Sequence, residues 1–274
     1  MAKMPSSKPI KVMFWTSPRS LSTVFTKAVS NLDKCVVFQE PFHTAYLYGP
    51  DRKHNTTEQD LPCGVETYYT YKNVQRMLEA DFTEQDVVFA KDSAIAITGN
   101  YEYLPKGFTH VFLIRDPIVI ATKAMALQNK FTDVGNTAKT TIEDYLSGSP
   151  YTDLYKLMEH IKTVLGQSPM VIDTKDLIED SEAVMRKFCT KVGLEFTENL
   201  LHWKPGVGDN WRVSKTKTML NEKTGIYKKA LESCCFVPSV ATESSANKEV
   251  PEMLKMVISV AVEHYNKMLA NETV

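Results

Sequence analysis

Residues 10–23, IKVMFWTSPRSLST, join a short apolar run to a turn and to the first residues of a helical pattern. The run at 10–16 ends at a Ser-Pro pair, which predicts a buried strand followed by a tight loop. Ser20 is a favourable N-cap, so we expect a helix from Leu21. The first amides of a helix lack internal partners and carry partial positive charge, which makes this loop a candidate anion site.

The residues expected around that anion are those of the loop and of the first helical turn. Hydroxyl groups can donate hydrogen bonds to an anion, and Arg19 adds a permanent positive charge. A strand and a helix joined by an ordinary capped turn would show the same pattern, so the loop alone leaves both interpretations open. The candidate residues are Ser17, Pro18, Arg19, Ser20, Leu21, Ser22 and Thr23.

Ionisable residues follow three further apolar runs. Glu40 comes shortly after the run 35–38, Lys91 directly after 86–90, and Arg115 directly after 109–114. A fifth run covers 169–173. Because the runs alternate with helical patterns, we expect an α/β fold in three layers, α/β/α, around a central, mostly parallel sheet. In such sheets ligands bind at the carboxyl ends of the strands, so these charges predict a polar, functional edge.

The chain between the strands is expected to be mostly helical, within one domain over residues 1–274. A polar, turn-rich segment at 44–63 predicts a long surface loop, which is a candidate for substrate selection. Apolar periodicity predicts helices at 21–32, 65–80, 119–129, 140–167, 181–192 and 251–269.

Composition excludes several classes of protein. With 274 residues and a formal net charge of −1, the chain lacks the basic excess of nucleic-acid binders. No window approaches the roughly 18 apolar residues of a membrane span, and no signal-peptide core is present. The five cysteines have no C-x-x-C spacing, which suits reduced thiols, and the histidines have no metal-ligand spacing. We expect a cytoplasmic protein that binds no nucleic acid, membrane or metal.

Three motifs, in order along the chain, resemble those of sulfotransferases that use 3'-phosphoadenosine-5'-phosphosulfate (PAPS). The strand and P-R-S turn at 10–23 are similar to the family's 5'-phosphosulfate loop, and R-D-P at 115–117 is similar to its 3'-phosphate segment. The stretch 173–203 resembles the family's core helix and the segment after it. The resemblance covers roughly residues 10–212, and it implies a P-loop NTPase-like fold with PAPS as co-substrate.

The resemblance also implies catalytic roles. Glu40 is placed like the glutamate that serves as catalytic base in some sulfotransferases, whereas others use a histidine elsewhere. His43 is the local rival and could instead contact the acceptor. Arg19 would stabilise the departing 5'-phosphate, and Lys91 is a hypothetical source of a proton for the leaving group.

Three positions depart from the family's pattern. Leu21 stands where a glycine is usual, Val24 where an aromatic often occurs, and Lys123 where a serine often follows the arginine. A lysine still binds phosphate as a point charge, so Arg115 and Lys123 together would hold the 3'-phosphate. Adenine stacking is unassigned. The candidates for the nucleotide in the C-terminal part of the match are Trp203, Trp211 and Arg212.

Two other functions remain open. A small-molecule kinase would need a G-x-x-x-x-G-K-[ST] loop, which is absent after the first strand, although Asp92 or Asp116 could hold magnesium. A non-catalytic nucleotide-binding protein would explain the departures at Leu21 and Val24. The net charge favours a small-molecule acceptor, but neither its identity, whether alcohol, phenol or amine, nor the oligomeric state can be read from the sequence.

Overall fold

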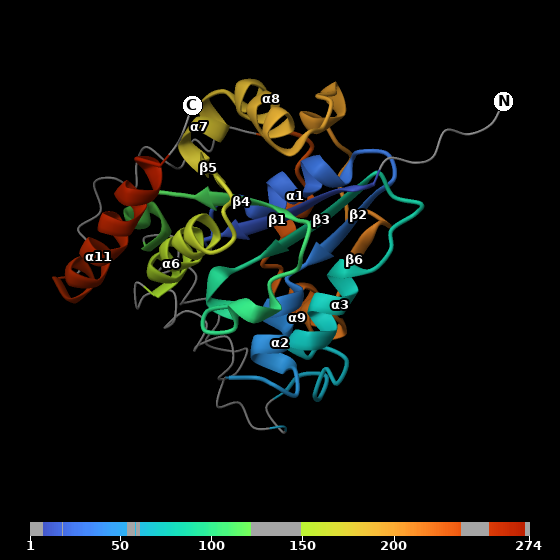
Figure 1. The fold of residues 1–274 in the computed structure, drawn as a ribbon, viewed down its shortest axis with the longest axis horizontal. Helices are drawn as coiled ribbons and strands as arrows, with labels where there is room; N and C mark the ends of the chain where they lie inside the picture. The colour runs from blue at the N-terminus through green and yellow to red at the C-terminus, as the bar shows by residue number, and fades with distance from the viewer. Residues whose placement is uncertain are drawn as a thin grey trace.

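The structure is a computed structural model that describes residues 8–17, 19–53, 58, 61–121, 149–236 and 252–271, without the side chains at 149 and 252–257. Six parallel strands form one sheet in the order β5-β4-β1-β3-β2-β6 (Figure 1). The strands are β1 Ile10–Thr16, β2 Cys35–Gln39, β3 Val87–Asp92, β4 Thr109–Ile114, β5 Met170–Asp173 and β6 Trp211–Val213. The predicted fold class is confirmed, and every described strand pair is parallel.

Alternating side chains of the strands build two hydrophobic cores, one on each face of the sheet. In β1, for example, Met13 and Trp15 belong to one core, whereas Val12 and Phe14 belong to the other. Because both faces are covered, the strands are apolar along almost their whole length. This explains why they stand out in the sequence as continuous runs.

Helices cover each face. Helices α1 (Ser22–Ser30), α8 (Ser181–Val192) and α10 (Lys228–Leu231) pack on one face, and α2 (Pro41–Tyr48), α3 (Tyr71–Glu79), α6 (Ser149–Thr163) and α11 (Glu252–Leu269) pack on the other (Figure 1). Short connections are α7 (Thr174–Glu179), α9 (Lys215–Thr224), η2 (Ala94–Ala96), η3 (Tyr101–Tyr103) and η4 (Glu198–Leu200).

The last crossing of the sheet matters most for the site. The chain leaves β5 at one edge, passes α8, and returns at the opposite edge as β6, which pairs with β2. As a result, α9 and α10 lie close to the end of β2, about 180 residues later in the sequence. No strand was predicted in this region, because its residues lack a regular apolar pattern.

Several predicted boundaries were wrong. Helix α1 begins at Ser22, after Leu21 in the left-handed region at φ 65°, and the Ser20 hydroxyl donates to the Ser17 carbonyl instead of capping the helix. The expected loop at 44–63 starts later, because α2 extends to Tyr48. The helix expected at 65–80 is confined to α3, which Thr70 caps.

Other predicted elements are confirmed or fall partly outside the described residues. Helix α8 has the expected buried face and ends at Gly193, whose φ of 80° suits glycine. Helix α11 is also confirmed. The helix at 119–129 and the first part of that at 140–167 lie largely outside the described residues, and α6 begins at Ser149 and Pro150. In the described part of the chain, no helix has the length and apolar character that crossing a bilayer requires.

Candidate active site

Parallel strands bring the residues that follow them to one edge of the sheet. Ser17 follows β1, Glu40 follows β2, Asp92 ends β3, Arg115 follows β4, and Ser214 follows β6. All five residues are buried. The polar carboxyl edge expected from the sequence is therefore present, and it contains the candidate active site.

The loop after β1 is held by its backbone carbonyl groups. The Thr174 hydroxyl donates to the carbonyl oxygens of Ser20 and Ile114, each at 2.8 Å. The Arg115 guanidinium donates to the Arg19 carbonyl at 2.9 Å. Because Arg19 itself has φ 60°, the loop places two residues other than glycine in the left-handed region, at a typical cost of about 1–3 kcal/mol each. The bonds to the carbonyls offset that cost.

The start of α1 remains a suitable anion site. No side chain caps this helix, and Ser22 and Thr23 lie in its first turn with small exposed fractions. Ser17 is buried beneath them, with its amide bonded to the Leu113 carbonyl. Pro18 lies outside the described residues. The loop residues predicted from the sequence are thus brought together, with Ser20 serving the loop's own backbone.

Arg115 lies beneath this loop. Burial, followed by the nearby Arg19 charge, lowers its pKa, although a guanidinium stays protonated at ordinary pH. Its bond to the Arg19 carbonyl makes it a support for the loop, in addition to any contact with a phosphate. Lys123, its expected partner, lies outside the described residues.

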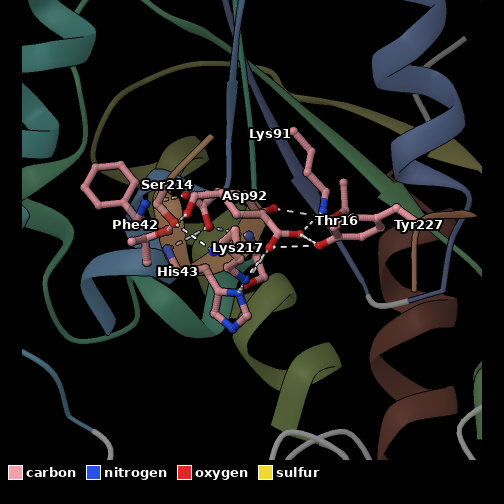
Figure 2. A network of polar contacts seen from close by, with 11 residues as sticks. Thr16, Phe42, His43, Lys91, Asp92, Ser214, Lys217 and Tyr227 are labelled. Carbon is pink, nitrogen blue, oxygen red and sulfur yellow. Dashed lines mark hydrogen bonds and ion pairs between the residues drawn. The ribbon is translucent and has the colours of Figure 1, made fainter. Parts of the chain in front are cut away.

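A buried polar cluster at this edge includes Lys91, Lys217 and Tyr227 (Figure 2), and all three contact Glu40. Its carboxylate contacts the Lys91 ammonium through Oε1, and the Lys217 ammonium lies 2.5 Å from Oε2. The Tyr227 hydroxyl donates to both oxygens, at 3.1 and 3.3 Å. The Glu40 backbone has φ 53°, and its amide donates to the Lys91 carbonyl at 2.7 Å. Residues from β2, β3, α9 and the turn before α10 thus meet at one carboxylate.

Two lysines decide the protonation of Glu40. Burial alone would raise the pKa of this carboxyl, but Lys217 and then Lys91 hold it well below its usual range. Glu40 is therefore ionised throughout the physiological pH range. Since one carboxylate faces two ammonium groups, the cluster has a local excess of positive charge.

His43 lies in the first turn of α2, next to the same cluster. Its Nδ1 is 2.7 Å from the Lys217 Nζ and 3.4 Å from Glu40 Oε2. Burial, reinforced by the Lys217 charge, lowers the pKa of His43 to about 4. The imidazole is consequently neutral at pH 7.

Asp92 anchors α2 from the neighbouring strand. Its carboxylate accepts from the amides of Phe42 at 2.6 Å and His43 at 3.1 Å, and so replaces the missing side-chain cap of that helix. Burial, followed by the Glu40 charge, raises the pKa of Asp92 to about 7. Both carboxylate oxygens bond to amides of α2, so Asp92 holds the helix that carries His43. The kinase alternative thereby loses one of its two candidate magnesium ligands.

The family assignment agrees with this geometry. A profile of the protein family described as Sulfotransferase domain matches residues 10–218. The chain belongs to the sulfotransferase domain family. The match includes the loop after β1, Glu40, Lys91 and Lys217, whereas Tyr227 lies beyond it.

Solved structures share the fold of this sulfotransferase domain. The sulfotransferase domain of the Synechococcus PCC 7002 olefin synthase is 16% identical with a TM-score of 0.59, covering 97% of this chain and 98% of that one. The sulfotransferase domain from the curacin biosynthetic pathway is 15% identical with a TM-score of 0.53, covering 95% and 99%. Mouse sulfotransferase SULT7A1, solved with PAP, is 11% identical with a TM-score of 0.50, covering 97% and 87%.

Curated relatives have a different description. Branched-chain-amino-acid aminotransferase-like proteins 2 and 1 of Arabidopsis thaliana are 23% and 24% identical over 204 residues, which cover 70% and 73% of this chain. The matched part is 31% and 33% of those proteins, so the chain spans about a third of the length of the curated relatives it matches.

The C-terminal candidates of the sulfotransferase domain lie apart from the Glu40 cluster. Trp211 and Arg212 are in β6, in register with Val37 and Phe38 of β2, and Arg212 is exposed. Trp203 is buried in the core with its indole N–H bonded to Ser233 Oγ at 3.2 Å, so it does not offer a face for adenine. Trp211 packs against the same core, and β3 and β2 separate its strand from β1, so adenine stacking stays unassigned.

Sequence reasoning missed Lys217 and Tyr227. Both follow β6, which has only three residues and lies within a stretch of mixed aromatic, charged and glycine residues. The available signal was Ser214, which caps α9 by accepting from the Lys217 amide at 3.3 Å. A serine cap after a short strand would have placed Lys217 in the first turn of a helix at the carboxyl edge.

Proposed function

We propose that this chain acts as a single sulfotransferase domain, residues 1–274, which transfers a sulfuryl group from PAPS to a hydroxyl or amine of a small molecule. The observation that carries the proposal is the buried, ionised Glu40 carboxylate, in contact with Lys91 beside the loop that follows β1. The sulfotransferase family match supports it, as does the fold shared with a mouse sulfotransferase solved with PAP.

The donor nucleotide would occupy the carboxyl edge at β1 and β4. The first amides of α1, with Ser22 and Thr23, would bind the 5'-phosphosulfate, because helix N-termini favour anions. Arg19 would stabilise charge on the departing phosphate. Arg115 and Lys123 would hold the 3'-phosphate. Trp211 and Arg212, which the sequence also suggested for the nucleotide, lie in β6, with β3 and β2 between them and β1, and have no role in this arrangement. No metal is needed for this arrangement.

Glu40 would accept the proton of the attacking group. As the acceptor oxygen or nitrogen forms its bond to sulfur, its proton moves to a Glu40 oxygen, and the bond from sulfur to the 5'-phosphate oxygen breaks with its electron pair left on the phosphate. A carboxylate with a very low pKa is a weak base. Lys91 could raise the basicity of Glu40 when the donor binds. If the sulfate attracts the Lys91 ammonium group away from Glu40, the carboxylate has one cation fewer beside it and its pKa rises.

The expected setting is the cytoplasm, where cysteines remain reduced. All five cysteines are free, and Cys35 and Cys189 are buried in the core, where burial raises the pKa of both thiols. The acceptor is proposed to be a small molecule, because the chain's near-neutral charge does not suit a long polyanion.

The first prediction concerns Glu40→Gln. This variant keeps the shape of the side chain but cannot accept a proton, so sulfuryl transfer from labelled PAPS to a panel of alcohols, phenols and amines should fall by about 10²–10⁴-fold. Calorimetry should show that 3',5'-adenosine bisphosphate still binds. Full activity in Glu40→Gln would remove Glu40 as the base, and no transfer by the wild type across the panel would favour a non-catalytic nucleotide-binding protein.

A further inference from the structure

Lys217 occupies an unfavourable place for a cation unless it has a specific role. It is the third residue of α9, where the helix dipole disfavours positive charge, and its side chain is buried. It contacts Glu40 and His43, the latter visible in Figure 2. The lysine therefore acts on the groups that would meet the acceptor.

The two contacts of Lys217 settle how His43 carries its proton. An ammonium group has only donors, so at 2.7 Å the Nδ1 of His43 must accept. The alternative, in which Nδ1 donates to Glu40, has the longer distance of 3.4 Å. A neutral imidazole that accepts at Nδ1 carries its hydrogen on Nε2.

We propose that Lys217 is a positioning residue that fixes the tautomer of His43, so that His43 presents an Nε2–H donor to the sulfate acceptor while Glu40 accepts the acceptor's proton. Figure 2 shows the second ring nitrogen of His43 directed away from Lys217. The assignment of the acceptor contact rests on the proposed function. For this contact, the sulfate acceptor must carry a lone pair close to the atom that attacks sulfur. A hydroxyl group provides such a lone pair.

The groups around His43 support a neutral ring in this form. Burial, then Lys217 and Lys91, oppose a charged imidazole, whereas Glu40 favours one, and the pKa is lowered to about 4. Asp92 accepts from the His43 backbone amide rather than from the ring. Tyr46 stacks beside the ring with centroids 6.3 Å apart.

Imidazole nitrogen NMR of the donor-free protein tests the tautomer directly. In the wild type, Nδ1 of His43 should resonate as an unprotonated nitrogen and Nε2 as a protonated one, with the signals assigned by their loss in His43→Asn. In Lys217→Met, Glu40 faces the ring alone, so Nδ1 should become protonated. Lys217→Arg retains a donor-only cation and should restore the wild-type pattern. Lys215→Met, at an exposed position of the same helix, is the matched control and should change nothing.

A protonated Nδ1 in the neutral wild-type ring, or a Lys217→Met spectrum identical to the wild type, would overturn the proposal. The wild-type spectrum decides even if Lys217→Met fails to fold. In the enzymatic assay, His43→Phe should raise the KM for the acceptor by about 10-fold, the loss of one hydrogen bond, and leave the KM for PAPS unchanged. A chain with no sulfuryl transfer would refute the proposed function while leaving the tautomer result intact.

Discussion

At the scale of residues, two buried carboxylates in adjacent strands have opposite surroundings. Glu40 faces two lysines and is held ionised, whereas Asp92 faces backbone amides and has a pKa raised to about 7, first by burial and then by Glu40. Environments that push pKa values apart commonly separate chemical roles. Here Glu40 is suited to the reaction and Asp92 to holding α2.

Asp92→Asn should reveal the raised pKa of Asp92 through stability. Between about pH 4 and 7 the folded state binds a proton that the unfolded state has released, so the contribution of Asp92 falls as pH rises, by at most about 1.4 kcal/mol per unit. The difference in the free energy of unfolding between wild type and variant should therefore shrink from pH 4 to 7 and level off above. Urea denaturation at several pH values measures it. The exposed Asp33→Asn is the control, and a constant difference for Asp92→Asn would contradict the shift.

At the scale of elements, the strands that end on charged residues could be predicted, and the conformations between them could not. Continuous apolar runs predicted β1 to β5. Glu40 and Lys91 were found because ligands bind at the carboxyl ends of parallel strands. The left-handed backbone of Arg19, Leu21 and Glu40 has no glycine to signal it. It depends on bonds from distant segments, such as Thr174 and Arg115, which sequence patterns do not contain.

Thr174→Val should weaken the loop that follows β1. The valine keeps the volume of the side chain but removes the two bonds to the carbonyls of Ser20 and Ile114, so the protein should lose about 1–2 kcal/mol of stability. Its affinity for 3',5'-adenosine bisphosphate should fall as well. Chemical denaturation and calorimetry give the two values. The control is Thr190→Val, at an exposed position of α8, where the native hydroxyl donates to the Arg186 carbonyl of the same helix. It should leave the affinity unchanged, and equal effects of both variants would argue against the loop's dependence on Thr174.

At the scale of the whole molecule, the sheet buries a titratable histidine, His110, in its centre beside Trp15. The Trp15 indole of β1 donates to His110 Nδ1 of β4 at 2.9 Å, and the planes of the two rings are nearly parallel, at 2°. Burial lowers the pKa of His110 to about 4, so the ring is neutral in the folded protein. This hydrogen bond was not predicted, because Trp15 and His110 each lie in an apolar run, where the sequence pattern gives no sign of a buried polar contact.

His110 should make the whole fold sensitive to acid. Above pH 6.5 its contribution to stability is fully present, and it is lost as pH falls toward 4, because the unfolded state takes up a proton first. His110→Asn retains an acceptor for Trp15 but does not titrate, so its stability should fall less steeply over this range. Thermal unfolding between pH 4 and 7 tests this, and parallel slopes for variant and wild type would refute it.

The chain returns to the β2 edge of the sheet late in the sequence, and this determines the shortest fragment that keeps the site intact. A fragment cut at residue 218, where the family profile stops, would keep Lys217 but discard Tyr227 and the carbonyls of Leu231 and Ser233 that bind the buried Lys27 ammonium. Such a truncation would expose one side of α1 and strip a hydroxyl from the Glu40 carboxylate. Boundaries for expression should therefore be drawn beyond Phe236, which packs on Phe25 and Trp203.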